Sequence, residues 1–429
     1  MSKPMNRLAA EEAWREARES FDAGVPWLAE ARRSALEAFE KDGLPTPRTE
    51  DWRWSDIHRY LNAPYPPAVA TPAEGLDTLV ASNPFVGVDA SLMVFVNGRL
   101  DPGRSRLKEE DGVDVLALSE APLAPEWTDF SARDDAIDQL NLAYATDGAL
   151  VRVRAGLQAS VPLVVLNITT GEGISCALRH QVRVEEGASF TLYEVQLGSG
   201  DHVANVVTAV KLDEAASLTR IQANLKDERT IHFANLDADV GARARLHDLA
   251  VLVGGRFHRQ QDFVDFSGEE AEARVDSAYL LRGRQHADTR LVVNHAVPHC
   301  TSRETFKCVM DENARGAFQG RIHVAPGAQK TDGQMAAHGL LLGEMAEFDA
   351  KPELEIYADD VVCAHGATAG ALDEEQLFYL RARGITERRA RGMLISAFVA
   401  ETFDDVENEA ARSALQNLAE SWLAEEGGA

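Results

Sequence analysis

The feature that most constrains the fold is a pattern that recurs every 28 residues in the middle of the chain. A turn and a small residue precede alternating apolar residues in "GASFTLYE", "AASLTRIQ", "RARLHDLA" and "AEARVDSA", which begin at positions 187, 215, 243 and 271. Two further copies, "RGAFQGRI" and "EMAEFDAK", begin at 315 and 344. Short strands at a near-constant period are typical of stacked coils, so the pattern predicts a β-solenoid or parallel β-helix. An ordinary β-sandwich with chance similarity is the alternative interpretation.

Three parts are predicted along the chain. Residues 1–90 form a helical domain with a loop, residues 91–370 form the β core, and residues 371–429 form a second helical domain. Good helix formers dominate residues 7–20 and 27–41, whereas the prolines of "LPTPRTEDWRWSDI" and "NAPYPPAVATPAEG" predict loops. Beyond them, short β-branched runs such as "LMVFVNGRL" and "VPLVVLNITT" indicate strands.

The C-terminal part carries the signals of amphipathic helices. Asp373 is a good N-cap, with Gln376 three positions on in a capping-box arrangement, and Thr386 caps the following helix. That helix has an apolar stripe of Ala390, Met393, Leu394, Ala397 and Phe398, and a last helix has one of Val406, Ala410, Leu415, Leu418 and Trp422. A stripe does not reveal whose surface it meets, so docking to a partner and packing on the chain's own core both stay open.

The charge balance excludes some classes of partner. With 43 basic and 69 acidic residues the formal charge is −26, which repels nucleic-acid phosphates. No run reaches the roughly 18–20 apolar residues of a membrane span, and the first 20 residues lack the apolar core of an export signal, so a cytoplasmic protein is expected. The four cysteines contain no CxxC pair, which leaves no ready-made zinc or cluster site.

Several catalytic signatures are missing. Lys330-Thr331 resembles the end of a P-loop, but Gln329 replaces the required glycine. Asp359-Asp360 invites comparison with solenoid enzymes that cleave acidic polysaccharides. Adjacent side chains on a strand point to opposite faces, however, so we expect a turn pair there rather than a general acid and base.

Cys363 and His365 are the most suggestive pair of side chains. Two residues apart after the strand-like "LEIYA", they share one face of an extended chain. They fit a nucleophile and base, two metal ligands, or buried core residues. Because two ligands cannot close a tetrahedral site, a metal would need donors from another coil or another subunit. The candidates within the chain are His295, His299, Cys300 and Cys308.

Several longer sequence motifs resemble those of a known protein family. "KPELEIYADDVVCAHGATAG", followed by "LDEEQLFYLRARGI", closely resembles the C-terminal signature of the SufD branch of the SufB/SufD family of iron–sulfur cluster assembly scaffolds. The segments "HCTSRETFK", "GRIHV", "QKTDGQM" and "LPTPRTEDWRWSD" are also similar to that family. One departure is Cys308, which stands after Lys307 where the family is expected to have glycine, so its thiol is expected to be peculiar to this chain.

The resemblance implies a fold and a role. The fold is mainly β, with a right-handed parallel β-helix core between two helical domains. The role is a non-catalytic scaffold that pairs with a SufB-like paralogue through the β-helix, or with a second copy when alone. A SufC-like ATPase would bind the C-terminal helices, for which the candidate contacts are Phe378, Leu380, Met393, Leu394 and Phe398.

The resemblance also implies what the site does. His365, with Cys363 beside it, would help to form a transient iron–sulfur cluster at the interface with the SufB-like subunit, while the isolated chain would hold no cofactor. The alternative from a different class is a solenoid enzyme acting on carbohydrate, with Asp359 and Asp360 in its groove.

Overall fold

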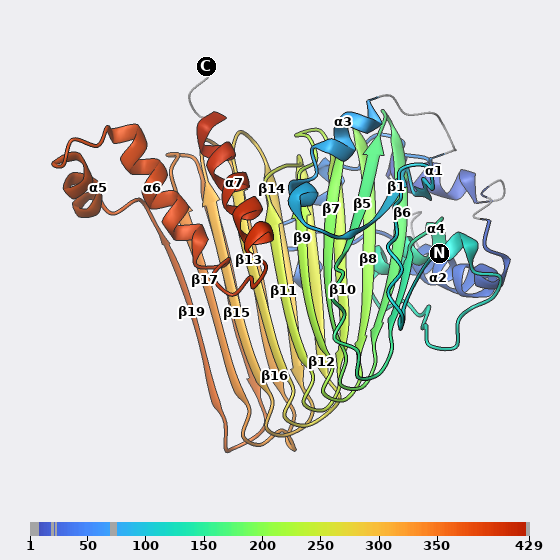
Figure 1. Cartoon of the computed structure of the whole chain (residues 1–429). Helices are drawn as coiled ribbons and strands as arrows, with labels where there is room; N and C mark the ends of the chain where they lie inside the picture. The colour runs from blue at the N-terminus through green and yellow to red at the C-terminus, as the bar shows by residue number, and fades with distance from the viewer. Residues whose placement is uncertain (1–7, 19–20, 22–23, 69–74, 426–429) are drawn as a thin grey trace.

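Two parallel β-sheets face each other along the whole molecule, and the chain passes from one to the other in every coil (Figure 1). The computed structural model describes residues 8–18, 21, 24–68 and 75–425. Every strand from β5 to β17 pairs in parallel with the strand two places further along the chain, which is the hydrogen-bonding pattern of a β-solenoid. The predicted solenoid core between helical segments is confirmed.

The first sheet forms one wall of the solenoid. Its strands, in spatial order, are β2 (Arg99–Leu100), β1 (Ser91–Val96), β5 (Leu163–Thr170), β7 (Ser189–Ser199), β9 (Ser217–Asn224), β11 (Arg245–Leu252), β13 (Glu272–Leu281), β15 (Thr301–Met310), β17 (Asp332–Leu341) and β19 (Val362–Gly370). The second sheet forms the opposite wall, with β3 (Val113–Ala117), β4 (Ala149–Val153), β6 (Ile174–Val184), β8 (His202–Leu212), β10 (Ile231–Val240), β12 (Phe257–Phe266), β14 (His286–His295), β16 (Arg315–Val324) and β18 (Glu347–Ile356).

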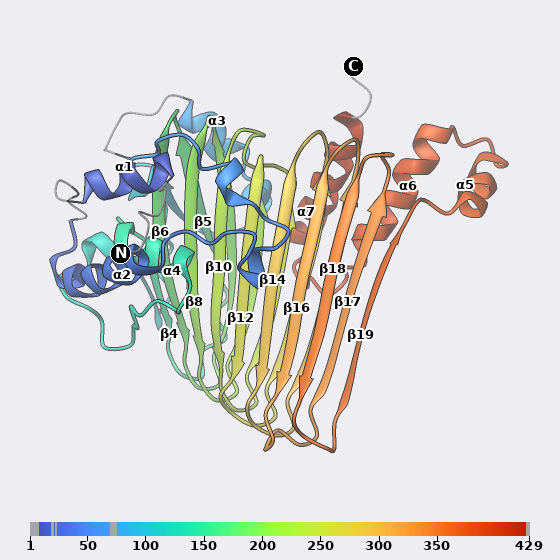
Figure 2. The same cartoon turned by 180° about the vertical axis from the view of Figure 1, so that it is seen from behind.

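Helices lie at both ends of the chain and on the outer faces of the sheets (Figures 1 and 2). The α-helices are α1 (Ala9–Ala17), α2 (Ala29–Asp42), α3 (Leu76–Ala81), α4 (Ala136–Tyr144), α5 (Glu374–Arg381), α6 (Glu387–Ala400) and α7 (Glu409–Glu425). Short 3₁₀ turns are η1 (Pro26–Leu28), η2 (Glu50–Trp52), η3 (Ile57–Arg59), η4 (Pro84–Gly87) and η5 (Leu118–Glu120).

A left-handed residue at one corner of each coil explains the 28-residue period. Ala215, Arg243, Glu270, His299 and Lys330 have φ between 55° and 62° at this corner, where the earlier coil has Gly187 with φ 65°. The backbone N–H of each of these residues donates to a carbonyl in the next coil, for example Ala215 N to Ala242 O at 2.7 Å. The repeat therefore marks a turn that the backbone needs once per coil.

The later copies of the repeat lie in the other sheet from the first four copies. The four copies from 187 to 271 precede or enter β7, β9, β11 and β13 of the first sheet. The copies at 315 and 344 belong instead to β16 and β18 of the second sheet. Alternating apolar residues after a turn occur in both walls, so the sequence pattern alone does not distinguish them.

Side-chain alternation separates the lumen from the outer walls. In β11, Leu246, Ala250 and Leu252 pack in the cluster that both sheets share, whereas Leu249 and Val251 pack outward with the C-terminal helices. The lumen also holds charge: Arg220 donates to Glu194 at 2.6 Å and to Asp248 at 2.7 Å, with all three side chains buried. This ion cluster joins three successive coils of one wall.

The two ends of the solenoid differ. At the N-terminal end, each sheet ends in an antiparallel strand: β2 pairs with β1, and β3 pairs with β4. The helices α1, α2 and α4 cover the second sheet at this end. At the C-terminal end, β18 and β19 each pair with one strand only among the described residues. In Figure 2 the N-terminal segment, in blue, crosses the outer face of the second sheet. Near the open end, Glu50 of this segment pairs with Lys351 of β18 at 2.8 Å.

The helix predictions need several corrections. The helices expected at 7–20 and 27–41 correspond to α1 and α2, with residues 7, 19 and 20 outside the described residues, and α4 lies inside the range 91–370 expected to form the β-helix core. The apolar face of α6 is rotated from the predicted stripe, because Ile395 and Val399 are buried while Met393 is exposed. Val406 precedes the last helix, which begins at Glu409.

Candidate functional site

The open C-terminal end of the solenoid contains the Cys363–His365 pair. Its two terminal strands have different edges. β18 reads "EFDAKPELEI", with a proline and charged side chains in its middle, which are the features that protect an edge against further pairing. β19 reads "VCAHGATAG", with small residues and neither proline nor Lys, Glu, Asp or Arg. The backbone edge of β19 is therefore the one left open to another strand.

Cys363 and His365 lie on the same face of β19, as their spacing predicts. That face points into the lumen, because Cys363 packs against the cluster between the two sheets. In the register of the first sheet, Cys363 is paired with Gly333 and His365 with Met335. Cys363 is half-buried and His365 is exposed, since no further coil covers them. The pair thus occupies the uncovered rim of the lumen.

The surroundings favour a protonated thiol. Burial raises the pKa of Cys363, and the negative charges of Asp332 and Glu304 act in the same direction, while the Gly333 backbone N–H opposes them. A thiolate at this position consequently needs positive charge brought from outside, such as a metal ion or a partner's side chain.

The other predicted donors do not join this pair. His295 is buried, with its Nε2 2.9 Å from the Ser302 hydroxyl, and burial lowers its pKa to about 4. The Cys300 thiol is directed at the carbonyl of Gly268, 3.4 Å away, and burial raises its pKa. His299 occupies the left-handed corner of its coil. Across the described ranges, no group of three or more His, Cys, Asp and Glu side chains is arranged to hold a metal ion.

Cys308 is a core residue in this structure. It is fully buried in the lumenal cluster, and burial raises the pKa of its thiol. A Cβ atom on Gly316 would approach its Sγ to 2.8 Å, so the missing side chain of Gly316 makes room for this thiol.

Asp359 and Asp360 lie in the bend between β18 and β19, as expected for a turn pair. The Asp360 carbonyl accepts from the backbone N–H of Lys330 at 2.6 Å and its carboxylate pairs with the Lys330 ammonium. The pair therefore closes the last corner of the solenoid.

The C-terminal arm presents a second candidate surface. α5 projects away from the solenoid, whereas α7 lies on the outer face of the first sheet (Figure 1). Phe378 on α5 is 73% exposed and Met393 on α6 is 44% exposed, but Leu380, Leu394 and Phe398 are half-buried. The stripe of α7 therefore packs on the chain's own wall, whereas docking of a partner to the arm stays a prediction.

Lys307 anchors this arm to the solenoid wall. Its ammonium donates to the carbonyl of Phe398 at 2.7 Å, near the end of α6, and pairs with Glu401. The same ammonium lies 4.9 Å from the centre of the Phe398 ring. Phe398 is thus engaged with the wall rather than presented to solvent.

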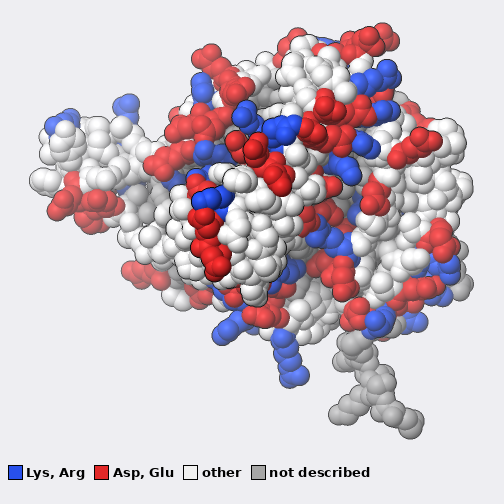
Figure 3. Space-filling view, turned by 90° about the horizontal axis from the view of Figure 1, so that it is seen from below, with Lys and Arg blue, Asp and Glu red and all other residues white. Residues whose placement is uncertain are grey.

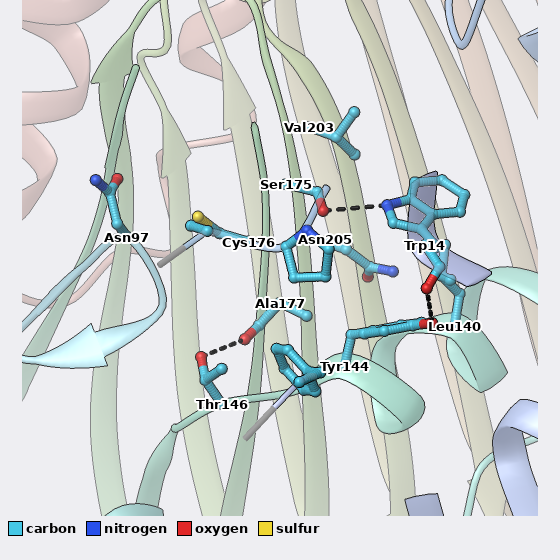
Figure 4. Close-up of a pocket in the computed structure, with 13 residues that line it drawn as sticks. Trp14, Asn97, Leu140, Tyr144, Thr146, Ser175, Cys176, Ala177, Val203 and Asn205 are labelled. Carbon is cyan, nitrogen blue, oxygen red and sulfur yellow. Dashed lines mark hydrogen bonds between the residues drawn. The ribbon is translucent and has the colours of Figure 1, made fainter. Parts of the chain in front are cut away.

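A small pocket at the opposite end was not predicted. It lies where α1 and α4 meet the start of β6 and has a volume of about 20 Å³ (Figure 4). The Trp14 indole donates to the Ser175 hydroxyl at 3.1 Å, and the Tyr144 hydroxyl donates to the Trp14 carbonyl at 2.5 Å. Cys176 lines it as well, but these polar groups mostly satisfy one another, so the pocket reads as a junction between the helical domain and the solenoid.

The surface charge agrees with the composition. Figure 3 shows acidic side chains spread over one face, with basic side chains among them rather than gathered in a single positive patch. Within the described ranges, no helix combines the length and the apolar character needed to cross a membrane.

Comparisons with known proteins find matches over most of the chain. A family model described as "SUF system FeS cluster assembly, SufBD core domain" matches residues 167–398, and one described as "SufBD protein N-terminal region" matches residues 12–165. The iron-sulfur cluster assembly protein SufD of Escherichia coli is 32% identical over 381 residues, which cover 87% of this chain and 88% of the relative.

Two further relatives match over similar lengths. The SufBD family protein slr0076 of Synechocystis is 28% identical, covering 88% of this chain and 87% of its own. The chloroplastic protein ABCI7 of Arabidopsis thaliana is 27% identical, covering 92% and 90%. The chain therefore belongs to the SufBD family of iron–sulfur cluster assembly proteins.

Proposed function

We propose that this chain is a non-enzymatic scaffold subunit of the SufD type, on which a transient iron–sulfur cluster forms as cargo at an interface with a SufB-like paralogue. The observation that carries the proposal is the open end of the solenoid. There an unprotected β19 edge stands beside a thiol and an imidazole that no further coil covers. A strand of the paralogue would extend the first sheet at β19 and bring the missing ligands to Cys363 and His365. In its absence, a second copy of this chain would take the same edge.

Co-expression with a SufB-like and a SufC-like partner tests this proposal. We expect one complex on size-exclusion chromatography that retains iron and sulfide, whereas the isolated chain retains neither and does not hydrolyse ATP. Failure to form the complex, or ATP turnover by the isolated chain, would refute the proposal.

His365 is the residue whose replacement should separate folding from function. Because its side chain is exposed, His365→Ala should leave the stability within about 0.5 kcal/mol. The complex that contains it should nevertheless yield much less cluster than wild type. His323→Ala is the matched control, since His323 lies half-buried on the outer face of β16. An unchanged cluster yield for His365→Ala would remove this residue from the assembly site.

We propose that the SufC-like ATPase binds the arm formed by α5 and α6. Phe378→Asp and Met393→Asp place a charge on the exposed side of the arm without touching its packing against the wall. Both should abolish capture of the ATPase. Val86→Asp is the control, because Val86 is 72% exposed on a different element and nearly matches the 73% exposure of Phe378. Equal capture by all three variants would show that the ATPase binds elsewhere.

A further inference from the structure

A second cluster of nitrogen donors lies inside the lumen, near the middle of the stack and away from the open end. His232 is the second residue of β10 and His258 is the second residue of β12, and the two residues are directly paired in the register of the second sheet. Asn224 ends β9 on the opposite wall of the same coil as β10. All three side chains are buried, with at most 2% of the surface of each residue exposed.

The distances between these side chains are short. The two Nδ1 atoms are 3.1 Å apart, and the Asn224 side-chain nitrogen is 2.7 Å from that of His232 and 3.1 Å from that of His258. The three atoms thus form a nearly equilateral triangle. A first-row metal ion about 2.1 Å from three donors on one octahedral face would hold those donors about 3.0 Å apart. The observed triangle has the size of such a face.

Hydrogen bonds alone account poorly for the same arrangement. If the amide donates to both rings, both Nδ1 lone pairs face each other at 3.1 Å, and both protons sit on Nε2. The Nε2 atom of His232 has no hydrogen-bond partner among the described residues, so its proton would be buried and unsatisfied. The two N–H bonds of an amide also diverge more widely than two acceptors so close together allow.

We propose that Asn224, His232 and His258 form a buried site for one divalent first-row transition-metal ion, bound by the two Nδ1 atoms and the amide oxygen. Two imidazoles and one oxygen donor suit Fe²⁺, Co²⁺ or Zn²⁺. Ligation requires the amide to turn so that Oδ1 faces the rings, which breaks its 3.2 Å hydrogen bond from the Lys226 backbone N–H. The ion would tie two successive coils of one wall to the opposite wall.

Lys226 is a charged side chain close to the cluster in sequence, two residues after Asn224. Its ammonium donates to the Leu197 carbonyl at 2.9 Å. The third donor is an asparagine, so this site is not one of the groups of three or more His, Cys, Asp and Glu side chains that the described residues lack.

Cobalt is a suitable probe because its spectrum reports the donor atoms. Since the site is buried, the full-length chain is refolded with Co²⁺, desalted and assayed for retained metal and visible absorption. We expect one equivalent with weak d–d bands and no thiolate charge-transfer band. His232→Gln and His258→Gln should each reduce retention at least tenfold. His180→Gln should retain it, because His180 is a buried lumenal histidine bound to Ala149 N and Asn167.

Two further variants make the test decisive even if a histidine variant fails to fold. Asn224→Asp replaces the amide by a carboxylate and should tighten Co²⁺ binding at least tenfold. Cys363→Ser combined with His365→Ala should leave retention unchanged, which separates this site from the proposed assembly site. Retention below a tenth of an equivalent in wild type, a thiolate band, or equal affinity in Asn224→Asp would each overturn the proposal.

Discussion

The buried carboxyl group of Glu304 should make the stability of the chain depend on pH. The side chain is fully buried in β15, and neither carboxyl oxygen has a hydrogen-bond partner among the described residues. Burial, the largest cause, raises its pKa from 4.5 to about 8. The folded chain therefore binds this proton more tightly than the unfolded chain does. The contribution of Glu304 to stability is retained below pH 4.5 and falls as the pH rises toward 8.

Glu304→Gln removes this titration while preserving the shape of the side chain. At 1.36 kcal/mol per pH unit, the gap between 4.5 and about 8 corresponds to a loss approaching about 5 kcal/mol in the wild type above pH 8. The variant should differ least from the wild type at pH 5 and become progressively more stable above it. The difference in unfolding free energy should reach several kcal/mol by pH 9.

Urea unfolding followed by circular dichroism between pH 5 and pH 9 measures this difference. The titratable groups that both proteins share contribute equally to the two unfolding free energies. The pH dependence of the difference between these free energies therefore reports Glu304 alone. Asp262→Asn is a useful companion, because burial also raises the pKa of Asp262 in the same lumen. A difference between Glu304→Gln and wild type that stays constant within about 0.5 kcal/mol across this range would refute the reasoning, since the carboxyl would then ionise as freely in the folded chain as in water.

Three further predictions concern packing. Gly316→Ala should destabilise the chain by about 1–3 kcal/mol, because its Cβ would meet Cys308 Sγ at 2.8 Å, and a double-mutant cycle with Cys308→Ala in urea unfolding should show that the second change relieves part of this cost. Lys307→Met should lower the unfolding free energy by about 1.5–3 kcal/mol and raise hydrogen exchange in α6. The control Glu401→Gln should lower the unfolding free energy less, because that carboxylate is 71% exposed. Equal protection of α6 in the two variants would show that Lys307 does not hold α6 on the wall. Gly187→Ala should cost only about 1–2 kcal/mol in the same unfolding assay, since nothing lies within 4 Å of its Cβ and an alanine occupies the equivalent corner at 215; a larger loss would mean that this corner differs from the others.

Sequence reasoning succeeds where one backbone requirement recurs. Each coil needs a turn with a left-handed residue and a strand with alternating apolar side chains, so the period of 28 appears in the sequence. The spacing of Cys363 and His365 likewise fixes a shared face, because strand side chains alternate with period two. These features are local, and local rules are enough to predict them.

Features that depend on contacts between distant segments are not predictable in this way. Asp135 is a local N-cap signal for the helix α4, but the place of that helix in the fold depends on packing against α2. Arg220 resembles an exposed strand residue in sequence, yet it is buried because Glu194 and Asp248 come from neighbouring coils. The buried face of α6 also follows from the wall it meets rather than from its own pattern.

The asymmetry of the two ends argues that one end of this solenoid is built for assembly. A stack of parallel coils ends in unpaired backbone groups on both walls, and folded proteins usually protect such edges. Here the N-terminal end has antiparallel strands and helices, and β18 has Pro352 and charged neighbours. β19 has none of these, and it is the strand that carries Cys363 and His365. The unprotected edge and the uncovered thiol and imidazole thus lie on one strand, which supports the proposal that a single partner covers both.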